Sequence, residues 1–449
     1  MKYLLLSIAV LASISTHAQE LPKLQSQFPL KWKAKIGGTS FKTNFLVHDG
    51  LLIVGSNGNH FRDWNLDKDN GIYILHPKSG KILQHFADEG LGDMDVNGVI
   101  AFGNHIYFGN DNDEFLCYDT CGKQIWRVPV SGDVESPPVL LDIDCNGTKE
   151  IIFGTEAGEV AALDPRNGKT VWSFKIKDFS GWSKTDNRFL FKVGAYFSNG
   201  GGFVAKPAVS DLNRDGVPDL IYNCRDNYTY AINGENGKML WKFNHGEIWY
   251  CANAPLVVEG RKGKEIYLLS ERKKENARYG SELVMVKLNE KGIQQKTFPD
   301  TYHYSINYTP VAHSGNLITV DRDSLAILNI KTGELKLQSL AYDDYNKTGD
   351  YYYYNYYRTV TAQPVLFDIL AKGSDQLIIT DEYGTVQILD GGNFKTLKRY
   401  MLPAGTETSS LIADIDDDGK MEMLIGCRDG YLYCYDLKRS ANGSIASLK

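Results

Sequence analysis

The sequence predicts an all-β protein, a β-propeller of eight four-stranded blades closed by the N-terminal strand. A phrase of alternating apolar residues, followed by Asp or Asn and a Gly turn, recurs eight times along the 449 residues. The turn glycines lie 41 to 69 residues apart, at Gly80, Gly122, Gly168, Gly237, Gly292, Gly333 and Gly392. Two-residue alternation at a spacing of about 40–50 residues is typical of propeller blades.

One unit shows the four expected strands most clearly, at residues 138–142, 150–154, 159–164 and 170–174. The fourth strand carries a tryptophan that recurs in other units as Trp126 and Trp241. The last unit ends near Asp436 without a fourth strand, whereas a similar segment surrounds Trp32 before the first unit. We therefore expect the Trp32 segment to complete the last blade and to remove its free sheet edge.

The N-terminal residues have the pattern of a secretory signal peptide. A charged start, an apolar stretch and a small-residue cleavage site fill residues 1–18, which leaves 19–449 as a single propeller domain. We expect the mature protein in the periplasm or outside the cell, without a membrane span and as a monomer. A net charge of −6 argues against nucleic acid as a partner.

Three loops place oxygen-bearing side chains at alternate positions before a glycine, which is the spacing that Ca²⁺ requires. They resemble the calcium loops of integrin-type propeller repeats, and we expect a structural role because each joins the first two strands of a blade. The pattern is cleaner in the loops at 211–219 and 414–422 than in the loop at 142–150. The predicted ligands are Asp142, Asp144, Asn146 and Glu150; Asp211, Asn213, Asp215 and Asp219; and Asp414, Asp416, Asp418 and Glu422.

The opposite face of the ring collects the long connections, and it is predicted to carry the functional residues. Loops of this length are usually functional. Histidines, tyrosines and arginines accumulate in these connections, and Arg pairs bidentately with carboxylate or sulfate groups. This residue mixture favours an anionic sugar as the ligand.

Two resemblances refine these predictions. The phrase from Leu163 to Trp172 resembles the pyrroloquinoline-quinone-type propeller repeat, which implies the fold alone. The segments 92–99 and 107–115 of the second blade resemble the propeller-type ulvan lyases and the related dehydratases of ulvan oligosaccharides. That resemblance implies a carbon–oxygen lyase that eliminates across C4 and C5 of a uronic acid, and it leaves internal cleavage and terminal dehydration open.

Elimination needs a cation on the uronate carboxylate, a base for H5 and an acid for the leaving oxygen. We expect Arg225 to neutralise the carboxylate and Tyr250, His245 or Lys206 to act as the base. The residues predicted to bind substrate are His303, Arg358, Tyr196 and Glu135.

The sequence leaves two alternatives open. The chain can be a non-catalytic propeller, either a glycan-binding protein or an assembly scaffold, because the same fold serves both kinds of protein. Glu135 and Glu407 both precede an innermost strand, where they can act as a glycosidase pair or bind a cation.

Overall fold

The computed structural model describes residues 21–58, 69–87, 94–177, 179, 202–246, 248–250, 253–273, 281–298, 308–321, 324–340, 360 and 362–440. The predicted signal peptide lies outside these ranges. Within them, no helix is long and apolar enough to cross a membrane. The helical element within these ranges is a short 3₁₀ turn, η1 (Leu24–Ser26).

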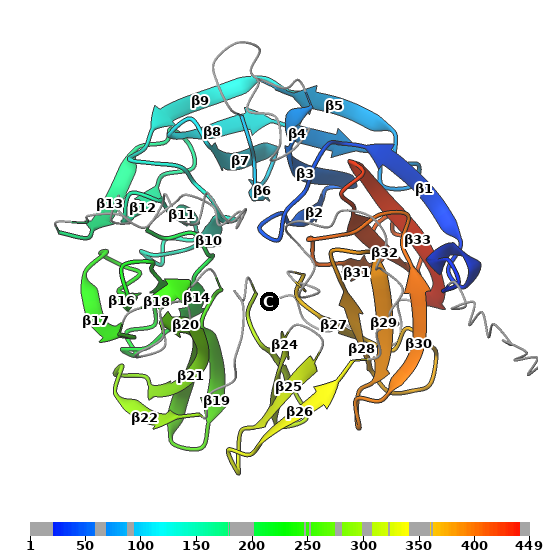
Figure 1. Cartoon of the computed structure of the whole chain (residues 1–449). Helices are drawn as coiled ribbons and strands as arrows, with labels where there is room; N and C mark the ends of the chain where they lie inside the picture. The colour runs from blue at the N-terminus through cyan, green and yellow to red at the C-terminus, as the bar shows by residue number, and fades with distance from the viewer. Residues whose placement is uncertain are drawn as a thin grey trace, which may run out of the picture.

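The described strands form eight antiparallel sheets arranged in a ring, which confirms the predicted propeller (Figure 1). Each of the first four blades takes four consecutive strands from the chain. Their bounds are β2 (Phe45–His48), β3 (Leu51–Asn57), β4 (Asn70–Leu75) and β5 (Ile82–Phe86); β6 (Val99–Phe102), β7 (His105–Asn110), β8 (Glu114–Asp119) and β9 (Gln124–Pro129); β10 (Val139–Leu141), β11 (Glu150–Gly154), β12 (Glu159–Leu163) and β13 (Thr170–Lys175); and β14 (Ala208–Ser210), β15 (Asp219–Asn223), β16 (Tyr228–Ile232) and β17 (Met239–Asn244).

The other half of the ring follows the same plan with one addition. In the fifth blade a short extra strand, β18, pairs with the far end of β20, beside β19. The bounds are β18 (Ile248–Tyr250), β19 (Leu256–Gly260), β20 (Gly263–Lys273), β21 (Ser281–Asn289) and β22 (Gln294–Thr297); β23 (Val311–His313), β24 (Asn316–Asp321), β25 (Ser324–Asn329) and β26 (Leu335–Ser339); β27 (Val365–Phe367), β28 (Gln376–Thr380), β29 (Thr385–Asp390) and β30 (Thr396–Met401); and β31 (Leu411–Ala413), β32 (Lys420–Gly426) and β33 (Tyr431–Ser440).

The eighth blade is completed by the N-terminal strand β1 (Leu30–Lys35), as the sequence predicts. β1 pairs antiparallel with β33, with Trp32 opposite Cys434 and Lys35 opposite Tyr431. In Figure 1 the blue strand β1 lies along the outside of the red strand β33. Residues more than 390 positions apart therefore share one sheet, and β33 has no free edge along this register.

The recurring tryptophan and turn glycine are explained by contacts between blades. The indole nitrogen of Trp172 donates a hydrogen bond of 3.0 Å to the carbonyl of Gly234 in the next blade, and Trp126 donates one of 3.0 Å to Pro165. A Cβ on Gly237 would lie 2.6 Å from the Trp172 ring. Because the turn glycine also has a positive φ of 71°, only glycine suits this position.

Two further tryptophans make the same contact, including the one on the closing strand. Trp32 donates a 2.7 Å hydrogen bond to Pro77 of the first blade, and Trp241 donates one of 3.0 Å to Glu290. The repeat therefore encodes an interlock between neighbouring blades. The apolar cores of the protein also lie between the facing sheets of neighbouring blades, as in the cluster of Ile152, Val160, Leu220 and Tyr222.

Candidate functional site

Acidic side chains gather in two places, one on each face of the ring. The first lies in the loops that join the innermost strand of a blade to the second strand. The second lies on the opposite face, in the connections that enter the innermost strands and in the turns between the second and third strands. These positions follow from the antiparallel order of the blades.

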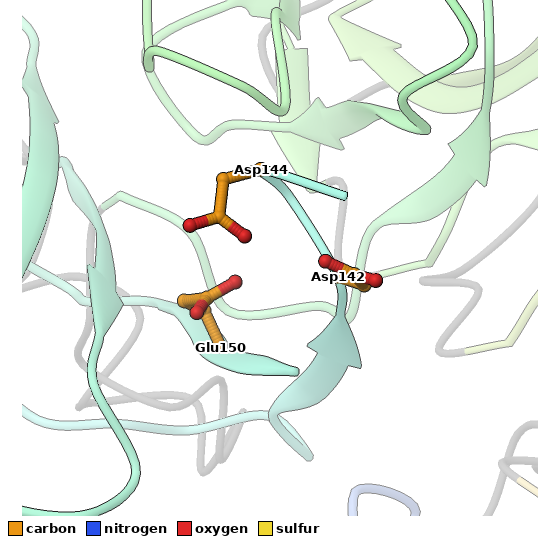
Figure 2. Close-up of side chains that lie close together, drawn as sticks. All are labelled: Asp142, Asp144 and Glu150. Carbon is orange, nitrogen blue, oxygen red and sulfur yellow. The ribbon is translucent and has the colours of Figure 1, made fainter. Parts of the chain in front are cut away.

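On the first face, two of the three predicted calcium loops bring three carboxylates together. Oxygen atoms of Asp142, Asp144 and Glu150 lie within 4.8 Å of one another in the β10–β11 loop, and so do those of Asp414, Asp416 and Glu422 in the β31–β32 loop. Figure 2 shows Asp144 and Glu150 pointing toward each other with Asp142 beside them. Such groups of hard oxygen ligands fit Ca²⁺.

The backbone of these loops is held by their own side chains. In the β10–β11 loop the carboxylate of Asp142 accepts hydrogen bonds from the amides of Asn146 and Gly147, at 3.0 and 2.9 Å. Glu150 accepts one from the amide of Ile143 at 3.2 Å. The loop therefore has defined hydrogen bonds that do not involve a metal ion.

A fourth loop of this kind, between β27 and β28, was not predicted from the sequence. Asp368 accepts hydrogen bonds from Lys372 and Gly373, at 2.8 and 2.9 Å, and Gln376 accepts one from Leu370 at 2.9 Å. The same positions have positive φ in all four loops, at Cys145, Arg214, Ala371 and Asp417. Because Leu370, Lys372 and Gln376 replace the acidic or amide side chains, the motif was not recognisable by its ligands.

The eighth-blade loop already contains a cation. The ammonium group of Lys31, on the closing strand β1, lies 3.0 Å from Asp416 and 2.7 Å from Glu422. The side chains of Asp416 and Glu422 are 2% and 1% exposed. Burial raises the pKa of Glu422, although hydrogen bonding to Lys31 acts in the opposite direction. Lys31 therefore takes two of the oxygens that a metal ion would use.

The β14–β15 loop has one of the two cleanest calcium-type spacings in the sequence. Its carboxylates accept hydrogen bonds from amide groups instead of pairing with a lysine. Asp219 accepts hydrogen bonds from the amides of Leu212 and Gly234, at 2.8 and 3.2 Å. Asp215 accepts from the side chains of Asn213 and Asn233, at 2.6 and 3.1 Å. Sequence spacing alone did not indicate which loop brings its carboxylates together.

On the opposite face, a polar cluster surrounds Glu135 next to the innermost strands β2, β6 and β10. Glu135 is 6% exposed and forms an ion pair with Lys42, which precedes β2. Asn97 donates a 2.9 Å hydrogen bond to Glu135, and Asn57 donates one of 3.1 Å to Asn97. Three blades therefore contribute side chains to one network.

Further carboxyl groups lie around this network and have perturbed proton affinities. Burial raises the pKa of Glu156 to about 9, and the charge of Glu135 and their shared hydrogen bond act in the same direction. Burial, with the charge of Glu135, raises the pKa of Asp133 to about 7. Burial also acts to raise the pKa of Glu135, but the charge of Lys42 and hydrogen bonds from Glu156 and Lys42 lower it. Like charges in a buried cluster disfavour full ionisation.

Two of the residues predicted to act in catalysis are buried and have described surroundings, Arg225 and His245. Arg225, 8% exposed, lies in the β15–β16 turn and helps to lower the pKa of Glu135. His245 is buried, 2.6 Å from the hydroxyl of Thr229, and burial with the charge of Arg272 lowers its pKa to about 3. A base of such low proton affinity is poorly matched to proton abstraction at neutral pH.

The other predicted residues are placed as follows. Lys206 is exposed, directly before the innermost strand β14, and partial desolvation lowers the pKa of its ammonium group. The backbone of Tyr250 lies in β18, opposite Glu271, and its side chain is not described. Tyr196, His303 and Arg358 lie outside the described residues.

The alternative glycosidase pair is not supported by the contacts of its members. Glu407 accepts hydrogen bonds from Arg428, including one of 2.9 Å from Nε. Arg428 also donates to Glu382 at 2.8 Å, while Glu135 is paired with Lys42. Both carboxylates are therefore engaged with cations from the chain itself. Lys42, Asp111 and Glu156 were missed because single polar residues in turns carry no pattern that identifies them.

Comparisons with known proteins relate this ring to an assembly factor. A family model described as outer membrane protein assembly factor BamB matches residues 68–177, from β4 to β13 with the flanking residues. BamB of Escherichia coli is 21% identical over 391 residues, which cover 74% of this chain and 89% of that protein. BamB of Nitrosomonas eutropha is 24% identical over 159 residues, or 35% of this chain. The blades resemble those of BamB. The chain spans about a third of the length of the Nitrosomonas relative, 34%.

Solved structures give the same fold. BamB from Moraxella catarrhalis covers 91% of this chain with a TM-score of 0.58 and 13% identity, and 99% of that structure is matched. Sqt1 of Saccharomyces cerevisiae has a TM-score of 0.60 and 10% identity, and the match covers 91% of this chain and 99% of Sqt1. At such identities the likeness shows the fold alone.

These findings correct the functional prediction. The resemblance to pyrroloquinoline-quinone-type repeats is confirmed by the BamB-type match, but the resemblance to ulvan lyases and dehydratases was wrong as a guide to function. The relatives are named as assembly factors, so the predicted carbon–oxygen lyase, its uronate-containing glycan and the catalytic roles of Arg225, Tyr250, His245 and Lys206 are withdrawn. The predicted location outside the cytoplasm agrees with the name of these relatives.

Proposed function

We propose that the chain is a non-catalytic propeller that assists the assembly of outer membrane proteins in the cell envelope. The observation that carries the proposal is the match to BamB of Escherichia coli, which extends over 391 residues and therefore over most of the ring. A match confined to one blade would support a shared repeat alone.

The contacts of the polar residues agree with a scaffold. Glu135 and Glu407 are paired with cations, and His245 is buried beside Thr229 and Phe243. A ring locked by Trp–Gly contacts presents a rigid surface. Such a surface can bind partners without losing much conformational entropy.

The proposal is tested in cells that lack this protein. We expect outer membranes purified from these cells to contain less of the membrane-embedded proteins, and the wild-type gene to restore them. The purified protein should also leave uronate-containing glycans without absorbance near ~235 nm, the signal of the unsaturated product whose carboxylate charge would need stabilising. Unchanged outer membrane proteins in the deletion strain would refute the assembly role.

We also propose that Ca²⁺ binds the third-blade loop through Asp142, Asp144, Asn146 and Glu150 and stabilises the fold. The convergence of three carboxylates there supports this assignment. In the eighth-blade loop Lys31 already pairs with Asp416 and Glu422, and in the fourth-blade loop amide groups already donate to Asp215 and Asp219. The proposal is therefore limited to the third blade.

A further inference from the structure

The cluster around Glu135 contains more acidic groups than cations. Its carboxyl groups come from two entrance connections and two turns, and the cations that act most strongly on them among the described residues are Lys42 and Arg225. The acidic members are Asp95, Asp111, Asp113, Asp133, Glu135 and Glu156. Burying unpaired charges costs free energy, so the free protein retains protons on some of these groups.

Two oxygen atoms in the cluster accept no hydrogen bond from the part of the chain that the structure describes. The side-chain carbonyl of Asn57 accepts none, although this residue is 8% exposed and its amide nitrogen bonds to Asn97 within the same network. One carboxylate oxygen of Asp111 is buried and also accepts no hydrogen bond. A buried acceptor without a donor is unfavourable by about 1–3 kcal/mol, and a ligand that supplies N–H groups removes this penalty.

The arrangement distinguishes between two kinds of cation. Among the described residues, three acidic side chains converge within 4.8 Å only in the two loops of the opposite face, not here. A single metal ion needs several oxygens at one point, whereas a guanidinium group or a polyamine spreads its donors over several ångströms. Lys42, already paired with Glu135, shows that the cluster accommodates an ammonium group.

We propose that the cluster around Glu135 binds a ligand that carries guanidinium or ammonium groups, with Asp111 and Asn57 as its free acceptors. The ligand is a basic peptide segment or a polyamine, which share this chemistry. The side chains come from four adjacent blades, because Arg225 of the fourth blade also acts on Glu135. The site is independent of the assembly role, since binding is measured on the purified protein.

The test is calorimetric titration of the purified full-length protein near physiological ionic strength. The probes are a short capped peptide with two arginines, spermidine and CaCl₂. We expect the peptide or spermidine to bind, and Asp111→Asn to weaken binding about tenfold or more, as for loss of a charge-assisted hydrogen bond. Glu407→Gln is the matched control because Arg428 already pairs with that carboxylate. Binding of the peptide or of spermidine identifies the source of the cation.

A second measurement requires no variant. If the ligand cation replaces protons held by the cluster, binding at pH 7 should release protons, which appears as a difference in heat between buffers of unlike ionisation enthalpy. Absence of binding by both organic probes would overturn the proposal. The proposal would also be overturned if Asp111→Asn and Glu407→Gln bound the organic probes with equal affinity, or if binding released no protons. A binding signal from CaCl₂ alone that depends on Asp111 would overturn it as well.

Discussion

The third-blade and eighth-blade loops have the same acidic pattern but neutralise it differently. In both, three carboxylates converge, and the terminal Glu accepts a backbone hydrogen bond, from Ile143 to Glu150 and from Ile415 to Glu422. Only the eighth-blade loop has a lysine, Lys31, among its carboxylates. The difference arises because the closing strand comes from the other end of the chain and is unique to this blade.

A repeated motif therefore does not imply a repeated ligand. In the eighth blade the cation is covalently part of the protein, so it needs no free ion and also links β1 to the β31–β32 loop. In the third blade the same carboxylates form no salt bridge with a lysine among the described residues, and the proposed calcium ion would take that place. The comparison predicts opposite responses of the two loops to substitution and to calcium.

Replacing Lys31 should lower the free energy of unfolding more than any other change considered. Lys31→Met leaves the buried carboxylates of Asp416 and Glu422 without their cation, and removing one partner of a buried pair costs about 3–5 kcal/mol. We expect a large drop in the denaturation midpoint in urea, partly recovered by millimolar calcium because the loop can then bind the ion. Lys33→Met is the control, since the Lys33 ammonium lies over the Tyr431 ring, 4.5 Å from its centroid. Equal losses in the two variants would contradict the role of Lys31.

Removing calcium should have the next largest effect. A ligand present at 100 times its dissociation constant stabilises the folded state by about 2.7 kcal/mol, so a chelator should lower the melting temperature of the wild-type protein. The double variant Asp142→Asn and Asp144→Asn should lose most of this chelator response. A chelator response that persists in the double variant would place the ion in another loop.

The pH dependence of stability tests the protonation of Glu150 in the third-blade loop. Burial raises the pKa of Glu150, and the charges of Asp144 and Asp142 act in the same direction. Without calcium, the folded state then holds a proton above the ordinary glutamate pKa, near ~4.3, so stability falls as pH rises through this interval. Glu150→Gln should remove this fall, because the amide oxygen can still accept from Ile143. Urea denaturation from pH 4 to pH 8 in the presence of a chelator measures this fall in stability for the wild-type protein and for Glu150→Gln.

Glu422→Gln provides the matched comparison. It should destabilise the protein at neutral pH by about 1–3 kcal/mol, because it removes the negative charge that pairs with Lys31. A stabilising effect of Glu422→Gln, or a destabilising effect of Glu150→Gln in chelator, would show that the two loops do not differ as proposed.

The ring itself was predictable because each blade repeats the same physical requirements. The contact between a turn glycine and a tryptophan recurs, as at Gly168 with Trp126 and at Gly237 with Trp172. This contact and the two-residue alternation of the strands therefore leave a periodic signal in the sequence. The closing strand was predictable for the same reason, since Trp32 has the same interlock. Repetition made these contacts visible without an alignment.

The sites were less predictable because their contacts join residues that share no period. Nothing local to Lys31 indicates that it lies beside Glu422, and nothing near Lys42 indicates its pairing with Glu135. The function was predicted wrongly because it rested on a resemblance of one blade to ulvan lyases and on the types of residue expected on one face. Their roles depend on partners that only the fold brings together, as for His245 beside Thr229.

The seventh-blade loop gives the smallest expected effect and the most direct control of the comparison. Gln376 occupies the place of Glu150, but it accepts its backbone hydrogen bond from Leu370, one loop position later than the Ile143 that donates to Glu150. Leu370 and Lys372 stand where Asp144 and Asn146 lie in the third blade. This loop therefore keeps a similar turn and the first carboxylate, Asp368, but not the acidic side chains that correspond to Asp144 and Glu150. Lys372→Ala at this exposed position should change stability by less than about 0.5 kcal/mol and leave the chelator response unchanged, as measured by thermal denaturation. A chelator response that changes in Lys372→Ala would mean that the loop backbone binds the ion, and the carboxylates of the third blade would lose their assigned role.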